Sequence, residues 1–164
     1  MRLHHRRDLI ASAAAITVAV LLAACSGSTS SSASSAVPAS LAAGMNACEV
    51  LTNEEIAAII GSDPGTAAID AEPTSCSYSG GLAVSIVPAD PSKSAEALMN
   101  EAGASGVLPL DRVGEDAAYA EFKDQGIVLL VARQGVAQVG VYLPASVDTA
   151  SKLAQAMLDK LASG

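Results

Sequence analysis

Carboxylates that stand close together are the residues best suited to chemistry in this chain. Glu54 and Glu55 are neighbours, and Glu115 and Asp116 follow shortly after Asp111. A facing pair of acids can hydrolyse a glycosidic bond, and several acids around a turn can bind calcium. A sugar cleft is normally lined with aromatic rings, however, and the chain has only three Tyr, one Phe and no Trp. The spacing of the acids also matches no EF-hand loop. We therefore expect solvated surface charges, with no catalytic residue, metal or cofactor.

Two serine–lysine neighbours offer nucleophilic chemistry without histidine. They are Ser92-Lys93 and Ser151-Lys152. A lysine activates a serine only when the two side chains face each other, which neighbours on a helix do not. We therefore predict exposed polar positions at both places. The glycine-rich run at 103–106 is too short for a phosphate-binding loop and follows an expected helix instead of a strand, which favours an ordinary loop.

Charge and aromatic content argue against a nucleic-acid partner. The chain carries 9 Lys+Arg and 17 Asp+Glu, a formal charge of −8. It lacks both the cationic face and the stacking rings that nucleic-acid binding requires. Tyr78, Tyr119 and Tyr142 could instead rim a ligand pocket, but we predict half-buried strand positions whose hydroxyl groups reach solvent.

The N-terminal segment has the pattern of an export signal. Three arginines lie within the first eight residues, and the uncharged apolar stretch Leu9–Ala24 follows. This stretch is shorter than the about 20 residues that a spanning helix needs. It ends in Leu22-Ala23-Ala24, and Cys25 follows directly, which is the pattern of a bacterial lipobox. We predict that residues 1–24 are a lipoprotein signal peptide and that Cys25 becomes the lipidated N-terminus.

Two alternatives remain open for this segment. A plain signal peptide, or an uncleaved anchor helix, could carry an incidental cysteine at position 25. The pair Arg6-Arg7 suits a twin-arginine export signal and the basic region of an ordinary Sec signal equally well.

Cleavage before Cys25 would change both the side chains available for catalysis and the net charge of the mature chain. Both histidines, His4 and His5, lie in the segment removed, which excludes Ser-His-Asp and Cys-His catalysis and zinc sites with imidazole ligands. Six basic and sixteen acidic side chains would remain, a formal charge of −10. Anionic lipid head groups repel such a domain, so only acyl chains at Cys25 would hold it to the membrane.

The next segment is predicted to be a tether. Ser26–Gly44 contains eight serines among nineteen residues and no charge. It cannot bury enough apolar surface to offset its chain entropy, so we predict that it is disordered. The predicted organisation is a signal peptide at 1–24, a lipidated cysteine and tether at 25–44, and one domain at 45–164.

Cys48 and Cys76 form an even pair once Cys25 is assigned to lipid. Export places them in an oxidising compartment, where a structural disulfide is the usual outcome. The alternatives are two buried free thiols or a redox-active pair. The two cysteines are not a CxxC motif, and no histidine is left to lower a thiol pKa. We therefore predict a disulfide that pins the first helix to the sheet.

Three short motifs carry a family resemblance. The first is Cys48–Glu55, which contains Leu51-Thr52 and the acidic pair Glu54-Glu55; the others are Ile59-Ile60-Gly61 and Cys76-Ser77-Tyr78. The segment Val113–Tyr119 also contributes to the resemblance. Together they resemble a family of small actinobacterial cell-envelope lipoproteins of unknown function, over roughly residues 46–162. The resemblance implies a location in the cell envelope, and it supplies no catalytic residues.

Three helices are predicted. Thr52 and Glu55 form a capping box, and an isoleucine stripe follows that ends at Gly61. Asp90 as N-cap and Pro91 at the first helical position open a second helix that runs to about Ala102. Apolar residues at helical spacing predict a third helix over 147–162.

Five strands are predicted between these helices. They cover 74–79 and 82–87, joined by a two-residue turn at Gly80-Gly81, and then 117–123, 127–133 and 136–143. The run 127–131 is apolar throughout and predicts a central strand. The predicted fold is therefore α+β in the order α-β-β-α-β-β-β-α, with three helices packed on one antiparallel sheet of about five strands.

These observations favour a non-catalytic binding or interaction module, anchored through Cys25 to the outer face of the cytoplasmic membrane. Its partner would be an envelope protein, a glycan or a lipid. The alternatives are a small envelope hydrolase that uses paired carboxylates, and an accessory or sensor subunit of an envelope complex. Two facing acids with raised pKa values in a deep pocket would favour the hydrolase.

Overall fold

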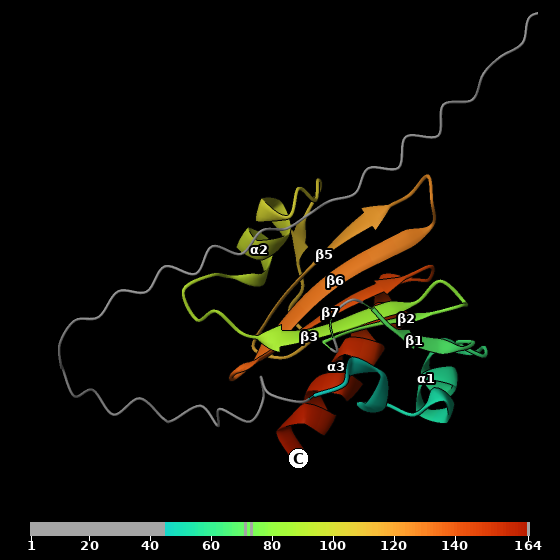
Figure 1. The fold of residues 1–164 in the computed structure, drawn as a ribbon. Coiled ribbons are helices and arrows are strands. Elements are labelled where there is room, and N and C mark those ends of the chain that lie inside the picture. The colour runs from blue at the N-terminus through green and yellow to red at the C-terminus, as the bar shows by residue number, and fades with distance from the viewer. Residues whose placement is uncertain (1–44, 71, 73, 164) are drawn as a thin grey trace, which may run out of the picture. The chain divides into compact units, whose positions relative to one another are not determined.

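A computed structural model describes residues 45–163 of the chain except Ala71 and Pro73 (Figure 1). The predicted signal peptide, Cys25 and the tether lie outside the described residues. The helical elements are the 3-10 turn η2 (Ala47–Glu49), α1 (Asn53–Ile60), α2 (Ala95–Glu101) and α3 (Val147–Ser163). The strands are β1 (Ala67–Ile69), β2 (Ser75–Tyr78), β3 (Ala83–Pro88), β4 (Leu108–Pro109), β5 (Asp116–Phe122), β6 (Ile127–Gln134) and β7 (Ala137–Leu143). Within the described ranges, no helix combines the length and apolar character that crossing a bilayer requires.

One antiparallel sheet contains all seven strands, in the order β1-β2-β3-β7-β6-β5-β4. The α+β class, the antiparallel sheet and its three α-helices are as predicted, and the apolar run 127–131 lies in the interior strand β6. The prediction of about five strands was wrong, because β1 and β4 add one strand at each edge. Both are short, and Pro109 in β4 is an edge residue that lacks a backbone donor. The observed order is α-β-β-β-α-β-β-β-β-α.

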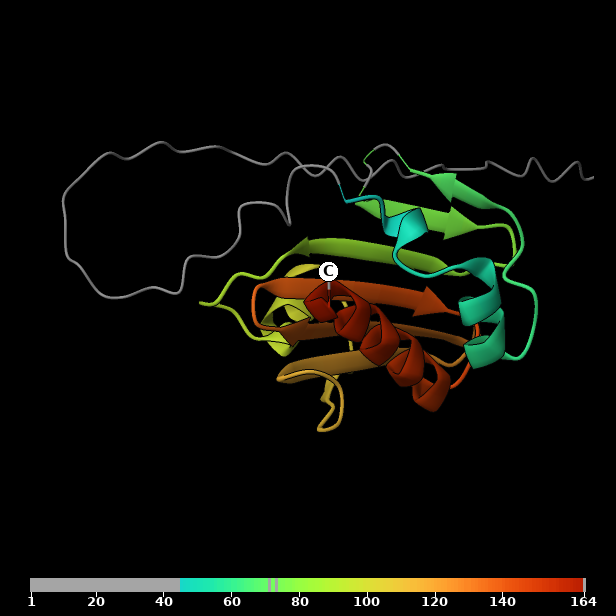
Figure 2. The same cartoon turned by 90° about the horizontal axis from the view of Figure 1, so that it is seen from below.

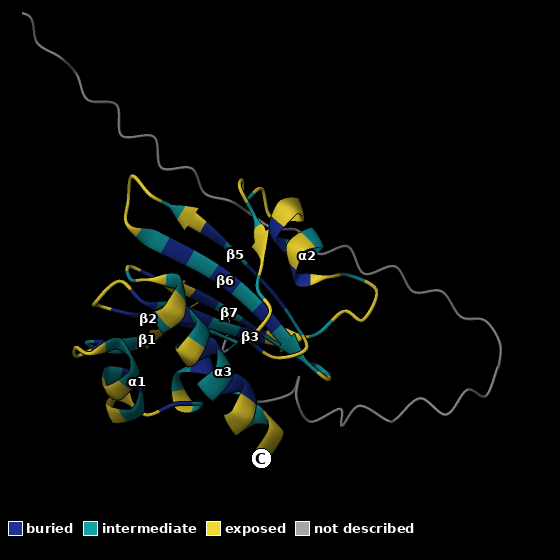
Figure 3. Ribbon diagram, turned by 180° about the vertical axis from the view of Figure 1, so that it is seen from behind, coloured by how far each residue is buried: buried dark blue, intermediate teal, exposed yellow. Residues whose placement is uncertain are grey.

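Strand register divides the side chains between two faces of the sheet. One row across β2, β3, β7 and β6 aligns Cys76, Val84, Val141 and Leu130, all buried. These residues belong to the main core, over which α3 lies (Figure 3). A row on the opposite face contains Val131 of β6 and Ala118 of β5, which belong to a second, smaller core. Helix α2 covers this core through Ala95 and Met99.

The two helices at opposite faces explain why residues 127–132 of β6 are all apolar. Helices α3 and α2 lie on opposite sides of the sheet (Figure 2). Alternate residues of β6 belong to the core under α3, where Leu130 is buried, and to the core under α2, where Leu129 and Val131 are partly buried. The face of β2, β3 and β7 away from α3 carries mostly small and polar side chains. Two larger apolar side chains also lie on it, Tyr142 (38% exposed) and Val87 (37% exposed). Helix α2 makes its principal sheet contacts with β5 and β6.

The second helix begins later than predicted. The Asp90 carboxylate accepts hydrogen bonds from the amide and hydroxyl of Ser92, at 2.9 and 2.6 Å, which forms a local turn instead of a helix cap. Ser94 is the N-cap, and its hydroxyl accepts from the Ala97 amide at 3.1 Å. Helix α2 therefore starts at Ala95.

The hairpin between β2 and β3 is also longer than predicted. The Tyr78 amide donates to the Leu82 carbonyl, so three residues form the loop instead of two. Gly81 has φ +87° at its end, which fits a three-residue hairpin loop that closes in a left-handed residue.

Candidate functional site

Glu55, one of the predicted surface carboxylates, has two structural roles. Its carboxylate accepts from the Thr52 amide at 2.7 Å, which completes the predicted capping box of α1. Its other oxygen lies 2.9 Å from Nζ of Lys160 on α3. The Lys160 contact and the Thr52 amide together hold the pKa of Glu55 below its ordinary value of 4.5. A carboxyl group with a lowered pKa is poorly suited to act as a general acid near neutral pH.

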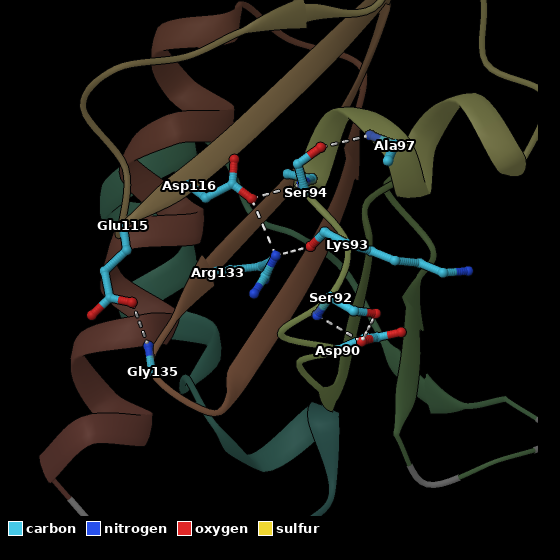
Figure 4. Close-up of polar contacts among 10 residues, drawn as sticks. Asp90, Ser92, Lys93, Ser94, Ala97, Glu115, Asp116, Arg133 and Gly135 are labelled. Atoms are coloured by element: carbon cyan, nitrogen blue, oxygen red, sulfur yellow. Dashed lines mark hydrogen bonds and ion pairs between the residues drawn. The ribbon is translucent and has the colours of Figure 1, made fainter. Parts of the chain in front are cut away.

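Glu115 and Asp116 face different partners (Figure 4). Oε2 of Glu115 accepts from the Gly135 amide at 3.1 Å. Oδ2 of Asp116 accepts from the Ala95 amide at 2.7 Å and lies 3.3 Å from Nη1 of Arg133. The same Nη1 donates to the Lys93 carbonyl. These bonds attach the start of α2 to the ends of β5 and β6, so Asp116 is a structural residue here.

The two serine–lysine neighbours do not form dyads. Ser92 donates to Asp90, whereas Nζ of Lys93 lies 2.6 Å from Glu101. The Ser92 hydrogen bonds lower the pKa of Asp90, and the hydrogen bond to Glu101 raises the pKa of Lys93. In α3, Ser151 donates to the Val147 carbonyl at 2.6 Å, and Lys152 pairs with Asp148 at 2.6 Å. Each lysine therefore has an acidic partner of its own.

The three tyrosines do not gather around one pocket. Tyr78 is buried on the α3 side of β2, and burial raises the pKa of its phenol. Tyr119 lies on the same face but on β5, four strands away, which corresponds to about 19 Å at the usual strand spacing. Tyr142 is on the opposite face and 38% exposed. Tyr78 is only 5% exposed, so the prediction of a half-buried position was wrong for this residue.

A disulfide joins Cys48 in η2 to Cys76 in β2, with a Cα–Cα distance of 5.2 Å. Cys76 is fully buried, so the bridge fixes the first described residues to the main core. Among the residues that the structure describes, no group of three or more His, Cys, Asp or Glu side chains is placed to hold a metal ion.

Hollows on the surface lie on both sides of α3. The α1 groove consists of two adjoining hollows that share Lys160 and Ser163, each of about 470–480 Å³. Its walls are η2, α1 and the last turns of α3. The lining residues are Met45, Asn46, Glu49, Val50, Leu51, Glu55, Ala58, Ile59, Ala156, Asp159, Lys160, Leu161 and Ser163. Apolar side chains form much of its surface, and acidic side chains outnumber the single lysine.

A second hollow, of about 470 Å³, lies between the first turns of α3 and the segment that joins β4 to β5. We call it the Arg112 groove. Its lining residues are Leu110, Arg112, Val113, Val147, Asp148, Ser151, Lys152 and Gln155. Its apolar side chains, Leu110, Val113 and Val147, come from two separate parts of the chain, and two exposed cations, Arg112 and Lys152, form its rim.

Hydrogen bonds fix the walls of the Arg112 groove. The Gly114 amide donates to Oε1 of Gln155 at 2.9 Å, and the Leu110 amide donates to the Ala117 carbonyl at 2.9 Å. The loop is therefore attached both to α3 and to β5. Sequence reasoning did not find this site, because its residues come together only when α3 lies on the sheet.

Comparisons of the chain with protein-family models, with curated proteins and with solved structures gave no match.

Proposed function

We propose that this protein is a binding module of the cell envelope, exported and held at the outer face of the cytoplasmic membrane by acyl chains on Cys25. The lipobox pattern and the serine-rich segment support the anchor. The Cys48–Cys76 disulfide supports export, because such bonds persist in oxidising compartments. The resemblance to actinobacterial lipoproteins agrees with the same location.

The main support for a binding role is that two apolar grooves, the α1 groove and the Arg112 groove, lie along α3. Ion pairs and hydrogen bonds hold the walls of both in place. Ligand sites are typically concave, mostly apolar and already formed before binding. Most of the acids and serines that would serve a hydrolase are engaged in hydrogen bonds and ion pairs instead: Glu55, Ser92, Glu115, Asp116 and Ser151. The lowered pKa of Glu55 is opposite to the shift that a catalytic acid requires.

Cell fractionation tests the anchor, with Cys25→Ala as the variant and Ser28→Ala as the matched control in the same segment. We expect the wild type and Ser28→Ala in the membrane fraction, and sensitive to protease added outside spheroplasts. Cys25→Ala should remain unprocessed or be released. Membrane retention and normal processing of Cys25→Ala would contradict the proposal.

A further inference from the structure

The Arg112 groove differs in charge from the rest of the described domain. Sixteen acidic side chains against six basic ones make residues 45–163 strongly negative, yet Arg112 and Lys152 both line this groove. Among the described residues, Arg112 and Lys123 have no ion-pair partner within 4.0 Å, whereas Lys93, Arg133, Lys152 and Lys160 each have one, and of the two only Arg112 lines this groove. An anion is therefore repelled over most of this surface and attracted at this rim.

The floor beneath that rim is apolar. Leu110 and Val147 line the groove as partly exposed side chains, and Val113, 2% exposed, packs beneath the surface. A guanidinium group beside the partly exposed apolar side chains of Leu110 and Val147 matches a ligand with an anionic head and a hydrocarbon tail. A glycan fits less well, because the lining contains no aromatic ring on which a sugar could stack.

The remaining polar groups of the groove restrict what can bind there. Asp148 is paired with Lys152 at 2.6 Å, although both side chains are largely exposed and the contact is correspondingly weak. Gln155 uses its amide group for Gly114 and Asp159, at 2.9 and 2.8 Å. Arg112 is therefore the group best placed to receive the anionic head.

We infer that the Arg112 groove binds a membrane phospholipid, with its anionic head group at Arg112 and Lys152 and one acyl chain along Leu110 and Val147. The volume of about 470 Å³ lies in the range of small-molecule sites. The inference rests on the proposed function in one respect, since an anchor at Cys25 would keep the groove close to a lipid surface.

Photocrosslinking of the purified full chain in lipid nanodiscs tests this inference. One set of nanodiscs contains phosphatidylglycerol with a photoactivatable acyl chain, and the other contains phosphatidylcholine with the same chain. We expect phosphatidylglycerol to label peptides that contain 110–113 or 147–155 in preference to phosphatidylcholine. Arg112→Gln should lower this labelling about fivefold, as loss of one solvent-exposed charge contact would. Lys123→Gln, which removes the same charge from the β5–β6 turn, should leave it unchanged.

Equal labelling by the two lipids, labelling that Arg112→Gln leaves intact, or labelling confined to other peptides would overturn the inference. Arg112 is exposed, so its replacement should not disturb folding, and circular dichroism checks this. The same peptide map contains the Cys25 peptide. An unmodified Cys25 would contradict the proposed anchor without affecting the result for the groove, so the two failures are distinguishable.

Discussion

Gly114 shows most clearly how a single residue shapes the Arg112 groove. Its φ of +59° is a conformation that L side chains rarely adopt, and its amide is the donor that attaches the loop to Gln155. A Cβ at this position would overlap the carbonyl oxygen of Arg133 and come within 3.0 Å of Leu158 Cδ1. The Arg133 carbonyl cannot retreat easily, because it accepts from the Glu115 amide at 2.7 Å.

Gly114→Ala should therefore lower the free energy of unfolding by about 2–4 kcal/mol, through backbone strain and steric overlap together. Gly126→Ala is the matched control, since Gly126 has φ +65° with nothing within 4 Å of a Cβ. It should cost only about 1–2 kcal/mol, the penalty for the left-handed conformation. Urea denaturation of both variants measures the difference, and equal losses would contradict the close approach at Gly114.

Some residue roles could be predicted from local sequence, and others could not. The capping box at Thr52 and Glu55 is complete within four residues, so its sequence pattern is sufficient. The start of α2 is different, because Asp90 and Ser94 are both good N-cap residues. The Asp116 carboxylate, which comes from another strand, accepts from the Ala95 amide in the first turn of α2. The residues around position 90 therefore cannot predict that Asp116 fixes the start of α2 at Ala95.

At the scale of elements, the ion pair between Glu55 and Lys160 joins α1 to α3 across the α1 groove. Since the folded pKa of Glu55 is lowered, its contribution to stability is present above the unfolded pKa and is lost as the pH falls through the folded value. We expect the melting temperature of the wild type to fall more steeply below about pH 5 than that of Glu55→Gln.

Glu54→Gln is the control for this prediction, because it removes a carboxylate from the same turn of α1 and leaves the capping box and the ion pair intact. Its pH profile should match that of the wild type. Thermal melts between pH 3 and pH 7 provide the measurement. Identical profiles for the wild type and Glu55→Gln would show that Glu55 contributes nothing to the acid dependence.

Helix α2 depends on one polar cluster and a small core. Ala95 and Met99 are its fully buried side chains, and Asp116 with Arg133 holds its first turn. Nε of Arg133 is buried without a hydrogen-bond partner among the described residues. Loss of the Asp116 carboxylate would therefore leave a mostly buried cation poorly compensated.

Asp116→Ala should speed hydrogen exchange of the α2 amides about tenfold or more, since hydrogen bonds to charged groups contribute about 1.5–3 kcal/mol. The amides of β7 should exchange at their wild-type rate. Asp111→Ala, in the exposed turn before β5, is the control and should leave α2 unchanged. Hydrogen exchange followed by mass spectrometry reports both regions. Equal acceleration of exchange in α2 and β7 would mean that α2 does not open independently of the sheet.

Elements with a long periodic pattern were predictable, and the edge strands were not. The strands β5, β6 and β7 alternate or continue in apolar residues over at least seven positions, so their existence follows from sequence. Strand β1 has three residues and β4 has two. Segments this short contain no measurable periodicity, and their pairing with β2 and β5 depends on the sheet already present.

At the scale of the whole molecule, the disulfide closes a loop that spans α1 and β1. The two cysteines are separated by 28 residues, and the chain-entropy model assigns such a loop about 3–4 kcal/mol. Replacing both with alanine should lower the free energy of unfolding by that amount. Reduced and alkylated wild type should show a comparable loss in urea denaturation. A loss below about 1 kcal/mol for both would mean that η2 is held chiefly by packing.

The arrangement of the sheet explains why the grooves escaped prediction. The Arg112 groove combines residues from 110–113 and 147–155, which are distant in sequence and meet because α3 crosses β6 and β7. The composition showed only that the chain is acidic with few cations, which is why two cations lining one groove stand out. That Arg112 and Lys152 line the same groove depends on the tertiary structure and could not be predicted from the sequence.

We propose that this chain is a lipid-anchored exported module with Cys48 and Cys76 oxidised together. Mass spectrometry of the intact protein purified from its native host tests it most directly. We predict a mature N-terminus at Cys25 that carries a diacylglyceryl thioether, together with a Cys48–Cys76 bridge. An N-terminus at Met1 with an unmodified Cys25, or free thiols at both Cys48 and Cys76, would contradict it.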